Sequence, residues 1–131
     1  MQVKGLNHIN IVTADLAGTV KFYETVLGME IKPPPMAPPP GFDGRWIADS
    51  HGQAIIHVQA YNPDRHPLRP GELNGTIDHV ALTCSDFDGT KRRCEELGVE
   101  YRVNDRMMGD LRQVFVTDPN NINLELNFAG E

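Results

Sequence analysis

The sequence predicts an α+β fold built from two βαβββ modules. A segment at residues 6–12, LNHINIV, returns at residues 77–83 as IDHVALT, and His8 and His79 hold the same place in the two copies. Each copy is followed by an aspartate, a helix-type stretch that ends at a glycine, and three strand-type segments. A repeat period of about 70 residues exceeds that of a solenoid unit. We therefore expect a duplicated supersecondary module within a single domain of 131 residues.

The first module is expected to span residues 1–61. Alternating apolar and polar residues predict a strand over residues 3–12, with His8 and Asn10 on the same face. Asp15 is placed to cap a helix with the apolar stripe Leu16, Val20, Tyr23 and Leu27, and Gly28 is placed to end it. Strands are then predicted over residues 30–32, 45–49 and 54–60. Between the first two, the proline-rich residues 33–41 predict a stiff, extended connector.

The second module repeats this plan over residues 77–131, after a linker over residues 62–76. Asp86 is the expected helix cap and Gly98 the expected stop, and strands are predicted over residues 100–103, 112–117 and 122–128. The only two cysteines are Cys84, at a strand end, and Cys94, on the apolar stripe of the helix. They are too few for a disulfide framework or a thiolate metal site, so we expect them to be small, inert apolar groups.

Composition and charge exclude several classes of partner. A net charge of −6 and an isoelectric point near 5.3 argue against nucleic-acid binding, and the basic cluster at residues 91–93 falls on a helix that is expected to face solvent. We find no signal-peptide pattern and no apolar run that approaches about 18 residues. The expectation is a soluble cytoplasmic protein that binds neither nucleic acid nor a membrane and that acts on a small molecule.

Four polar residues occupy matched strand positions in the two modules. His8 and His79 lie in the first strands, and His57 and Glu125 lie in the last strands. A pseudo-two-fold arrangement of the modules would bring these four side chains together. Imidazole and carboxylate together suit a divalent ion of Zn, Ni, Fe, Mn or Co, so we predict one metal ion bound by His8, His57, His79 and Glu125.

The chain also resembles the vicinal-oxygen-chelate superfamily, the glyoxalase, bleomycin-resistance protein and extradiol-dioxygenase family. The resemblance covers nearly the whole length. It is carried by LNH at residues 6–8, FYETVLG at 22–28, IHV at 56–58, DHVAL at 78–82, and FVTDPNN followed by LEL at 115–126. It implies that the two modules form a curved, incomplete barrel around a divalent metal, and that the chain forms a homodimer.

The resemblance also implies roles for individual residues. His8, His79 and Glu125 match the most widespread metal ligands of the family, and Glu125 would also move a proton in a glyoxalase-like lyase or isomerase reaction. His57 departs from the pattern, because it stands where glyoxalase I has a second glutamate. Val12 stands where glyoxalase I has an arginine that contacts glutathione, which argues against glutathione as the substrate.

Two other functions stay open. An extradiol-type ring-cleaving dioxygenase would use His8, His79 and Glu125 as a facial triad, with His57 and Tyr61 as acid–base groups. A binding protein of the bleomycin-resistance kind would sequester its ligand without a metal. For each of the enzymes, the predicted substrate contacts are Asn10, Arg106 and Arg112, because an arginine can clamp a carboxylate or enolate oxygen.

Overall fold

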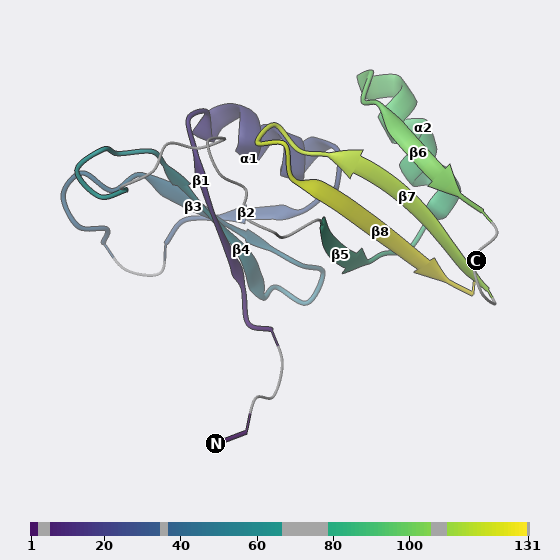
Figure 1. Ribbon diagram of the computed structural model, residues 1–131, viewed down its shortest axis with the longest axis horizontal. Coiled ribbons are helices and arrows are strands. Elements are labelled where there is room, and N and C mark those ends of the chain that lie inside the picture. Colours follow the sequence, from purple (N-terminus) through teal and green to yellow (C-terminus); the bar gives the residue numbers. More distant parts are fainter. Residues whose placement is uncertain (3–5, 35–36, 67–78, 106–109, 131) are drawn as a thin grey trace. The chain divides into compact units, whose positions relative to one another are not determined.

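The chain folds into two compact units, Met1–Glu72 and Leu73–Glu131, and each is described by itself (Figure 1). The computed structural model describes residues 1–2, 6–34, 37–66, 79–105 and 110–130. Most of the predicted linker over residues 62–76 therefore lies outside the described residues, as do the first residues of the strand expected over 3–12. None of the described helices is long and apolar enough to cross a bilayer.

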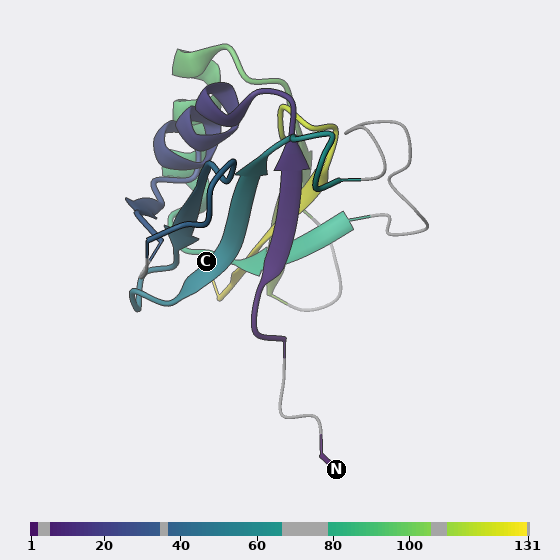
Figure 2. The same ribbon diagram turned by 90° about the vertical axis from the view of Figure 1, so that its left-hand side faces the viewer.

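The first unit follows the order βαβββ. Its elements are β1 (Ile9–Thr13), α1 (Leu16–Thr25), β2 (Glu30–Lys32), β3 (Gly44–Ala48) and β4 (Ala54–Ala60). The sheet order is β1-β4-β3-β2, with β1 parallel to β4 and the other pairs antiparallel. Figure 2 shows β1 alongside β4, the last strand of the unit in sequence.

The second unit repeats this topology. Its elements are β5 (His79–Thr83), α2 (Phe87–Leu97), β6 (Tyr101–Asn104), β7 (Leu111–Thr117) and β8 (Asn123–Ala129). Its sheet order is β5-β8-β7-β6, and β5 runs parallel to β8. The predicted α+β fold of two βαβββ modules is confirmed.

Strand alternation gives each sheet one buried face and one open face. In the first unit Ile11, Ile47, Ile56 and Val58 are buried together with Tyr23 of α1. In the second unit the buried strand residues are Val114, Val116, Leu124, Leu126 and Phe128, together with Phe87 and Cys94 of α2. Residues between these positions along each strand point to the opposite face, which the described helix of the same unit does not cover.

One strand begins later than predicted. The strand expected from residue 3 starts at Ile9, and residues 6–8 precede it as exposed, irregular backbone. If β1 included residues 6–8, these residues would run along the start of β4. At that end of β4 its pairing with β3 shifts register, between Ile47 and Ala48. Because a bulge twists a strand and disrupts its ladder, β1 pairs only with the regular part of β4, beginning with Ile9 opposite Ile56. His8 is therefore just outside the strand that was predicted to contain it.

The repeat extends to the hydrogen bonds of the last hairpin in each unit. The Asp49 carboxylate accepts hydrogen bonds from the backbone N–H groups of His51 and Gln53, both at 2.9 Å. Asp118 accepts equivalent bonds from Asn120 at 2.8 Å and Ile122 at 2.9 Å. These bonds stabilise the ionised carboxylate, and the bond from Gln53 is the main cause that lowers the pKa of Asp49 below 3.8.

Both helices also begin in the same way, with an aspartate side chain that caps the backbone N–H of a glycine three residues later. The carboxylates of Asp15 and Asp86 accept hydrogen bonds from the N–H groups of Gly18 and Gly89, at 2.9 and 3.0 Å. A Cβ on Gly18 or Gly89 would collide with the capping carboxylate. Glycine at this position thus leaves room for the cap. The predicted caps at Asp15 and Asp86 are confirmed, and so is the stop at Gly98, which adopts a φ of 66°.

We expect Asp15→Ala to lower the free energy of unfolding by about 1 kcal/mol, because it removes the side-chain acceptor of the Gly18 N–H in the first turn of α1. Asp15→Asn keeps an oxygen at the same place, so its free energy of unfolding should lie within a few tenths of a kcal/mol of that of the unaltered protein. Urea denaturation of the three proteins measures the difference. Equal losses in both variants would show that charge, and not capping, is what matters there.

Candidate metal centre

The predicted ligands lie on the open faces of the two sheets, in pairs within each unit. In the first unit, Asn10 of β1 stands opposite His57 of β4, and His57 stands opposite Trp46 of β3. Their neighbours along each strand, Ile11, Ile47, Ile56 and Val58, are buried. His57 is therefore held on the open face by the alternation of four residues that pack in the core.

His57 lies between two other rings. Its imidazole stacks on Trp46 with centroids 4.3 Å apart and an interplanar angle of 10°, and on His8 with centroids 4.0 Å apart and an angle of 19°. Burial between these rings disfavours the charged imidazolium, and a charge on His8 would disfavour it further. In that order the two effects lower the pKa of His57 below 6.5, which favours its neutral form at pH 7.

His8 is oriented by its neighbour in the chain. Its Nδ1 lies 2.7 Å from Oδ1 of Asn7. Since this oxygen only accepts, the hydrogen bond requires a proton on Nδ1, and in the neutral ring Nε2 then holds the lone pair, which is the arrangement common in histidines that bind metals.

The stack does not suit shared coordination by His8 and His57. Imidazole lone pairs lie in the plane of the ring. Two nearly parallel rings 4.0 Å apart cannot both point such a lone pair at one cation about 2.1 Å away. His57 in this arrangement supports the ring of His8 and does not join it as a second ligand.

In the second unit His79 and Glu125 form the other pair. Nε2 of His79 lies 3.6 Å from Oε2 of Glu125, and their side chains are 43% and 18% exposed. This separation is too long for a hydrogen bond. It is close to the spacing of two donors that each lie about 2.1 Å from one divalent cation. An imidazole nitrogen and a carboxylate oxygen on adjacent parallel strands therefore fit a divalent metal ion.

A chain of amide side chains supports the carboxylate of Glu125. Asn127 donates to Oε1 of Glu125 at 3.0 Å, Gln113 donates to Asn127 at 2.8 Å, and Asn104 donates to Gln113 at 3.4 Å. The chain crosses the sheet from β8 through β7 to β6 on one face. Because Asn127 occupies Oε1, the oxygen that remains directed at His79 is Oε2. Partners of this kind commonly orient metal-binding carboxylates.

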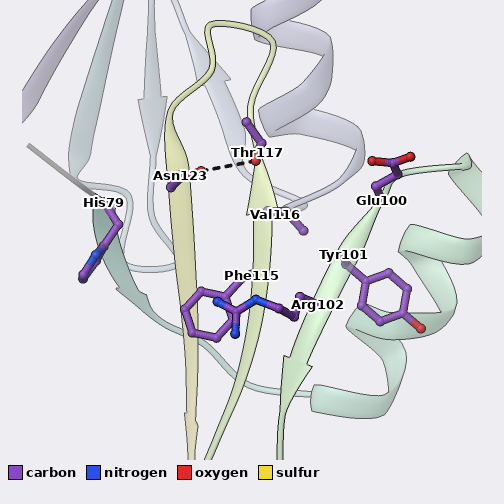
Figure 3. A pocket seen from close by; sticks show the side chains of 8 residues that line it. All are labelled: His79, Glu100, Tyr101, Arg102, Phe115, Val116, Thr117 and Asn123. Carbon is purple, nitrogen blue, oxygen red and sulfur yellow. Dashed lines mark hydrogen bonds between the residues drawn. The ribbon is translucent and has the colours of Figure 1, made fainter.

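The same face carries a shallow depression of about 500 Å³ (Figure 3). His79 and Asn123 line one side of it, and Phe115 and Arg102 also line it. The guanidinium carbon of Arg102 lies 4.0 Å from the centroid of the Phe115 ring. The depression therefore combines one of the predicted ligands with a cation and an apolar surface.

Arg112, which was predicted to contact substrate, lies on the other face of this sheet. It pairs with Phe128 across the strands, its guanidinium carbon stands 3.6 Å from the ring centroid of the buried Phe87, and its Nε donates to Asp105 at 2.8 Å. The reason is alternation: Arg112 is three residues from Phe115, so the two side chains point to opposite faces. Arg112 thus packs beside α2, away from Glu125.

Two further predicted residues have other surroundings. Tyr61 follows β4 by one residue and stacks on His66 with centroids 5.9 Å apart. His66 in turn accepts a hydrogen bond from the N–H of Asn62 at 3.0 Å. Arg106 lies outside the described residues.

Among the residues that the structure describes, no three His, Cys, Asp or Glu side chains gather closely enough to hold a metal ion.

Sequence reasoning missed three residues of these faces: Trp46, Arg102 and Asn127. Asn127 was detectable, because it lies two residues after Glu125 and therefore shares its face. Trp46 and Arg102 depend on cross-strand register, which pairs them with His57 and Phe115. That register is not readable from either strand alone.

In the metal-free protein, NMR titration should give His57 a pKa below 6.5, and His8→Gln should raise it by removing the neighbouring charge. A lowered pKa in the folded state means that the unfolded chain binds more protons between the two values. The contribution of His57 to stability is therefore complete above pH 6.5 and declines as the pH falls through the window below it.

Urea denaturation at pH 7 and at pH 5.5 measures this decline, and His57→Gln should reduce it. A His57 pKa at or above 6.5 in the folded protein would contradict the stacked arrangement.

Known proteins resemble this chain over most of its length. A protein of Arabidopsis thaliana named glyoxylase I 4 is 25% identical over 129 residues, which cover 96% of this chain and 71% of that protein. The metallothiol transferase FosB of Staphylococcus haemolyticus is 25% identical over 132 residues, which cover 95% and 84%.

Solved structures share the fold. A mutant of the fosfomycin resistance protein FosX from Listeria monocytogenes, complexed with Mn(II) and 1S,2S-dihydroxypropylphosphonic acid, superposes with a TM-score of 0.72 at 20% identity, covering 98% of this chain and 94% of that one. An integron cassette protein from V. cholerae gives a TM-score of 0.71 at 16% identity, with coverage of 98% and 97%.

The family model described as Glyoxalase/Bleomycin resistance protein/Dioxygenase superfamily matches residues 5–126. The repeated βαβββ topology, the polar pairs on the open faces and this match lead to one conclusion: the chain belongs to the glyoxalase, bleomycin-resistance protein and dioxygenase superfamily, the vicinal-oxygen-chelate proteins.

Proposed function

We propose that the protein is a metal-dependent lyase or isomerase of the glyoxalase type, acting on a small substrate that binds through neighbouring oxygens. The observation that carries the proposal is the His79–Glu125 pair, with its 3.6 Å separation and its amide support. Relatives that are enzymes by name, and Mn(II) in the FosX structure, support it.

The proposed ligands are His79, Glu125 and His8. Nε2 of His79 and Oε2 of Glu125 would bind the cation from the second module. His8 is assigned from its match to the first ligand of the family. Its Nδ1 is engaged in the hydrogen bond to Asn7, so Nε2 is the nitrogen that would bind the cation. A divalent cation held by these groups would stabilise the negative charge that develops on substrate oxygens when a C–H proton leaves.

Protein groups supply the proton transfer. Glu125 is the proposed base, because its carboxylate lies on the open face, where a bound substrate would meet it, and Asn127 holds it in one orientation. His57 and Tyr61 are the further proposed acid–base groups of the first module, and Asn10 is a proposed substrate contact because it stands opposite His57. We propose a homodimer as the assembly, by resemblance to short members of the family.

One observation favours a second candidate, the extradiol-type dioxygenase. With His57 stacked between Trp46 and His8, the proposed ligand set becomes two histidines and one carboxylate. That set is the facial triad of non-haem iron oxygenases, which leaves open positions for substrate and dioxygen.

Oxygen uptake with catechols by the iron-loaded protein would support the dioxygenase. Solvent-proton exchange at a carbon next to a carbonyl, without oxygen uptake, would support the lyase or isomerase.

We expect His79→Ala and Glu125→Gln each to lower the affinity for Mn(II) or Zn(II) by at least about 10-fold, because each removes a donor or its charge. His51→Ala is the matched control, since His51 is an exposed histidine in the hairpin after β3. Isothermal titration of metal-free protein measures the affinities. Unchanged affinity in both site variants would remove the basis of the proposed metal centre.

Asn127→Ala should lower metal affinity by roughly 10-fold, because it frees Glu125 to rotate. Asn104→Ala, at the far end of the amide chain with its longer 3.4 Å bond, should change it by less than about 2-fold. The same titrations compare the two. Equal losses of metal affinity in the two variants would show that the row of amide side chains stabilises the sheet and does not orient the carboxylate of Glu125.

A further inference from the structure

Arg102 lies on the open face of the second sheet, in one cross-strand row with Glu125. Glu125 of β8 stands opposite Phe115 of β7, and Phe115 stands opposite Arg102 of β6. Neighbouring strands are about 4.8 Å apart. Arg102 is thus two strands from Glu125, and Phe115 is the residue between them.

The side chain of Arg102 folds toward Glu125 and not away from it. Its guanidinium carbon stands 4.0 Å from the centroid of Phe115, so the charged group has moved from its own strand onto the next one (Figure 3). A guanidinium that stacks on an aromatic ring does so through its flat face. Its edge, which carries the N–H donors, is left to meet an oxyanion in the two-bond geometry that arginine forms with carboxylate or phosphonate groups.

The other arginines in the described strands, Arg45 of β3 and Arg112 of β7, have acidic partners. Arg45 pairs with Asp43 at 2.9 Å and Arg112 with Asp105 at 2.8 Å. Within the part of the chain that the structure describes, no carboxylate pairs with Arg102. Glu100 lines the same depression, but Figure 3 shows its carboxylate at the other end from the guanidinium. An arginine that is held on an aromatic ring beside a proposed metal site, without an acidic partner, has the features of a subsite for an anion.

We propose that Arg102, seated on Phe115, binds an anionic group of the substrate, a carboxylate or a phosphonate. The inference rests on the proposed metal site at His79 and Glu125. The substrate would then bind the cation through neighbouring oxygens at one end. Its other end would carry the anionic group, which would meet Arg102 over Phe115, one strand away from Glu125. Arg102 determines specificity in this proposal and takes no part in the proton transfer.

Three vicinal diols that differ only in one substituent test the subsite: 1,2-dihydroxypropylphosphonate, 2,3-dihydroxybutanoate and butane-2,3-diol. Their dissociation constants are measured by isothermal titration into Mn(II)-loaded protein. At least one anionic diol should bind more tightly than the neutral diol. Arg102→Gln should reduce that preference by about 10-fold or more, since a hydrogen-bonded charge pair is lost. Which anion loses more identifies the group as carboxylate or phosphonate.

Two variants sharpen the comparison. Arg102→Lys keeps the charge without the planar fork and should give a smaller loss than Arg102→Gln. Arg92→Gln, on the exposed surface of α2, is the matched control for a lost positive charge and should leave the preference unchanged. Equal losses in Arg92→Gln and Arg102→Gln would attribute the preference to net charge and overturn the subsite.

The outcomes separate this inference from the proposed function. If the protein binds Mn(II) but Arg102→Gln leaves the anion preference intact, the subsite is wrong and the metal centre stands. If the protein does not bind Mn(II), the metal centre is wrong, and the subsite is decided in metal-free protein with inorganic phosphate as the probe. A phosphate-dependent NMR shift of the Arg102 Nε–H signal supports the subsite, and its absence overturns it.

Discussion

The parallel pairing of the first and last strands in each unit is the constraint on which the rest of the structure depends. Parallel neighbours cannot be joined by a short turn, so the chain must pass through a helix and two further strands before it returns. That return sets Asn10 beside His57 in one unit and Ala81 beside Glu125 in the other, with His79 two residues from Ala81. A slip of one residue would turn Glu125 into the core and turn Leu124 and Leu126, which are now buried, onto the open face.

The two units use this scaffold to hold different polar groups. In the first, aromatic faces contact the histidines, and burial in the stack favours the neutral form of His57. In the second, a half-buried carboxylate loses part of its hydration, a cost that the hydrogen bond from Asn127 offsets. Duplication thus preserved the helix caps and the aspartate hairpins, while the open faces diverged. Packing constrains the buried face of a sheet much more than the open one.

Much of this fold could be predicted from the sequence because its signals are local. The repeat at residues 6–12 and 77–83, the aspartate caps and the strand alternation each depend on residues close together in the chain. The misses involve pairing between strands. The start of β1 depends on where β4 becomes regular, and the choice between Arg102 and Arg112 depends on the register of β7 against β6 and β8. Of the candidate site, alternation along β4 and β8 is enough to put His57 and Glu125 on the faces opposite their buried neighbours, whereas the stack on Trp46 depends on the register.

The central claim is that His79 and Glu125 bind one divalent cation. Crystals of the whole protein soaked in Mn(II) and measured at the manganese absorption edge test it most directly. The account predicts one strong anomalous peak within about 2.3 Å of both Nε2 of His79 and Oε2 of Glu125. Peaks confined to other pairs, such as Asp49 and His51, with none between His79 and Glu125, would contradict it.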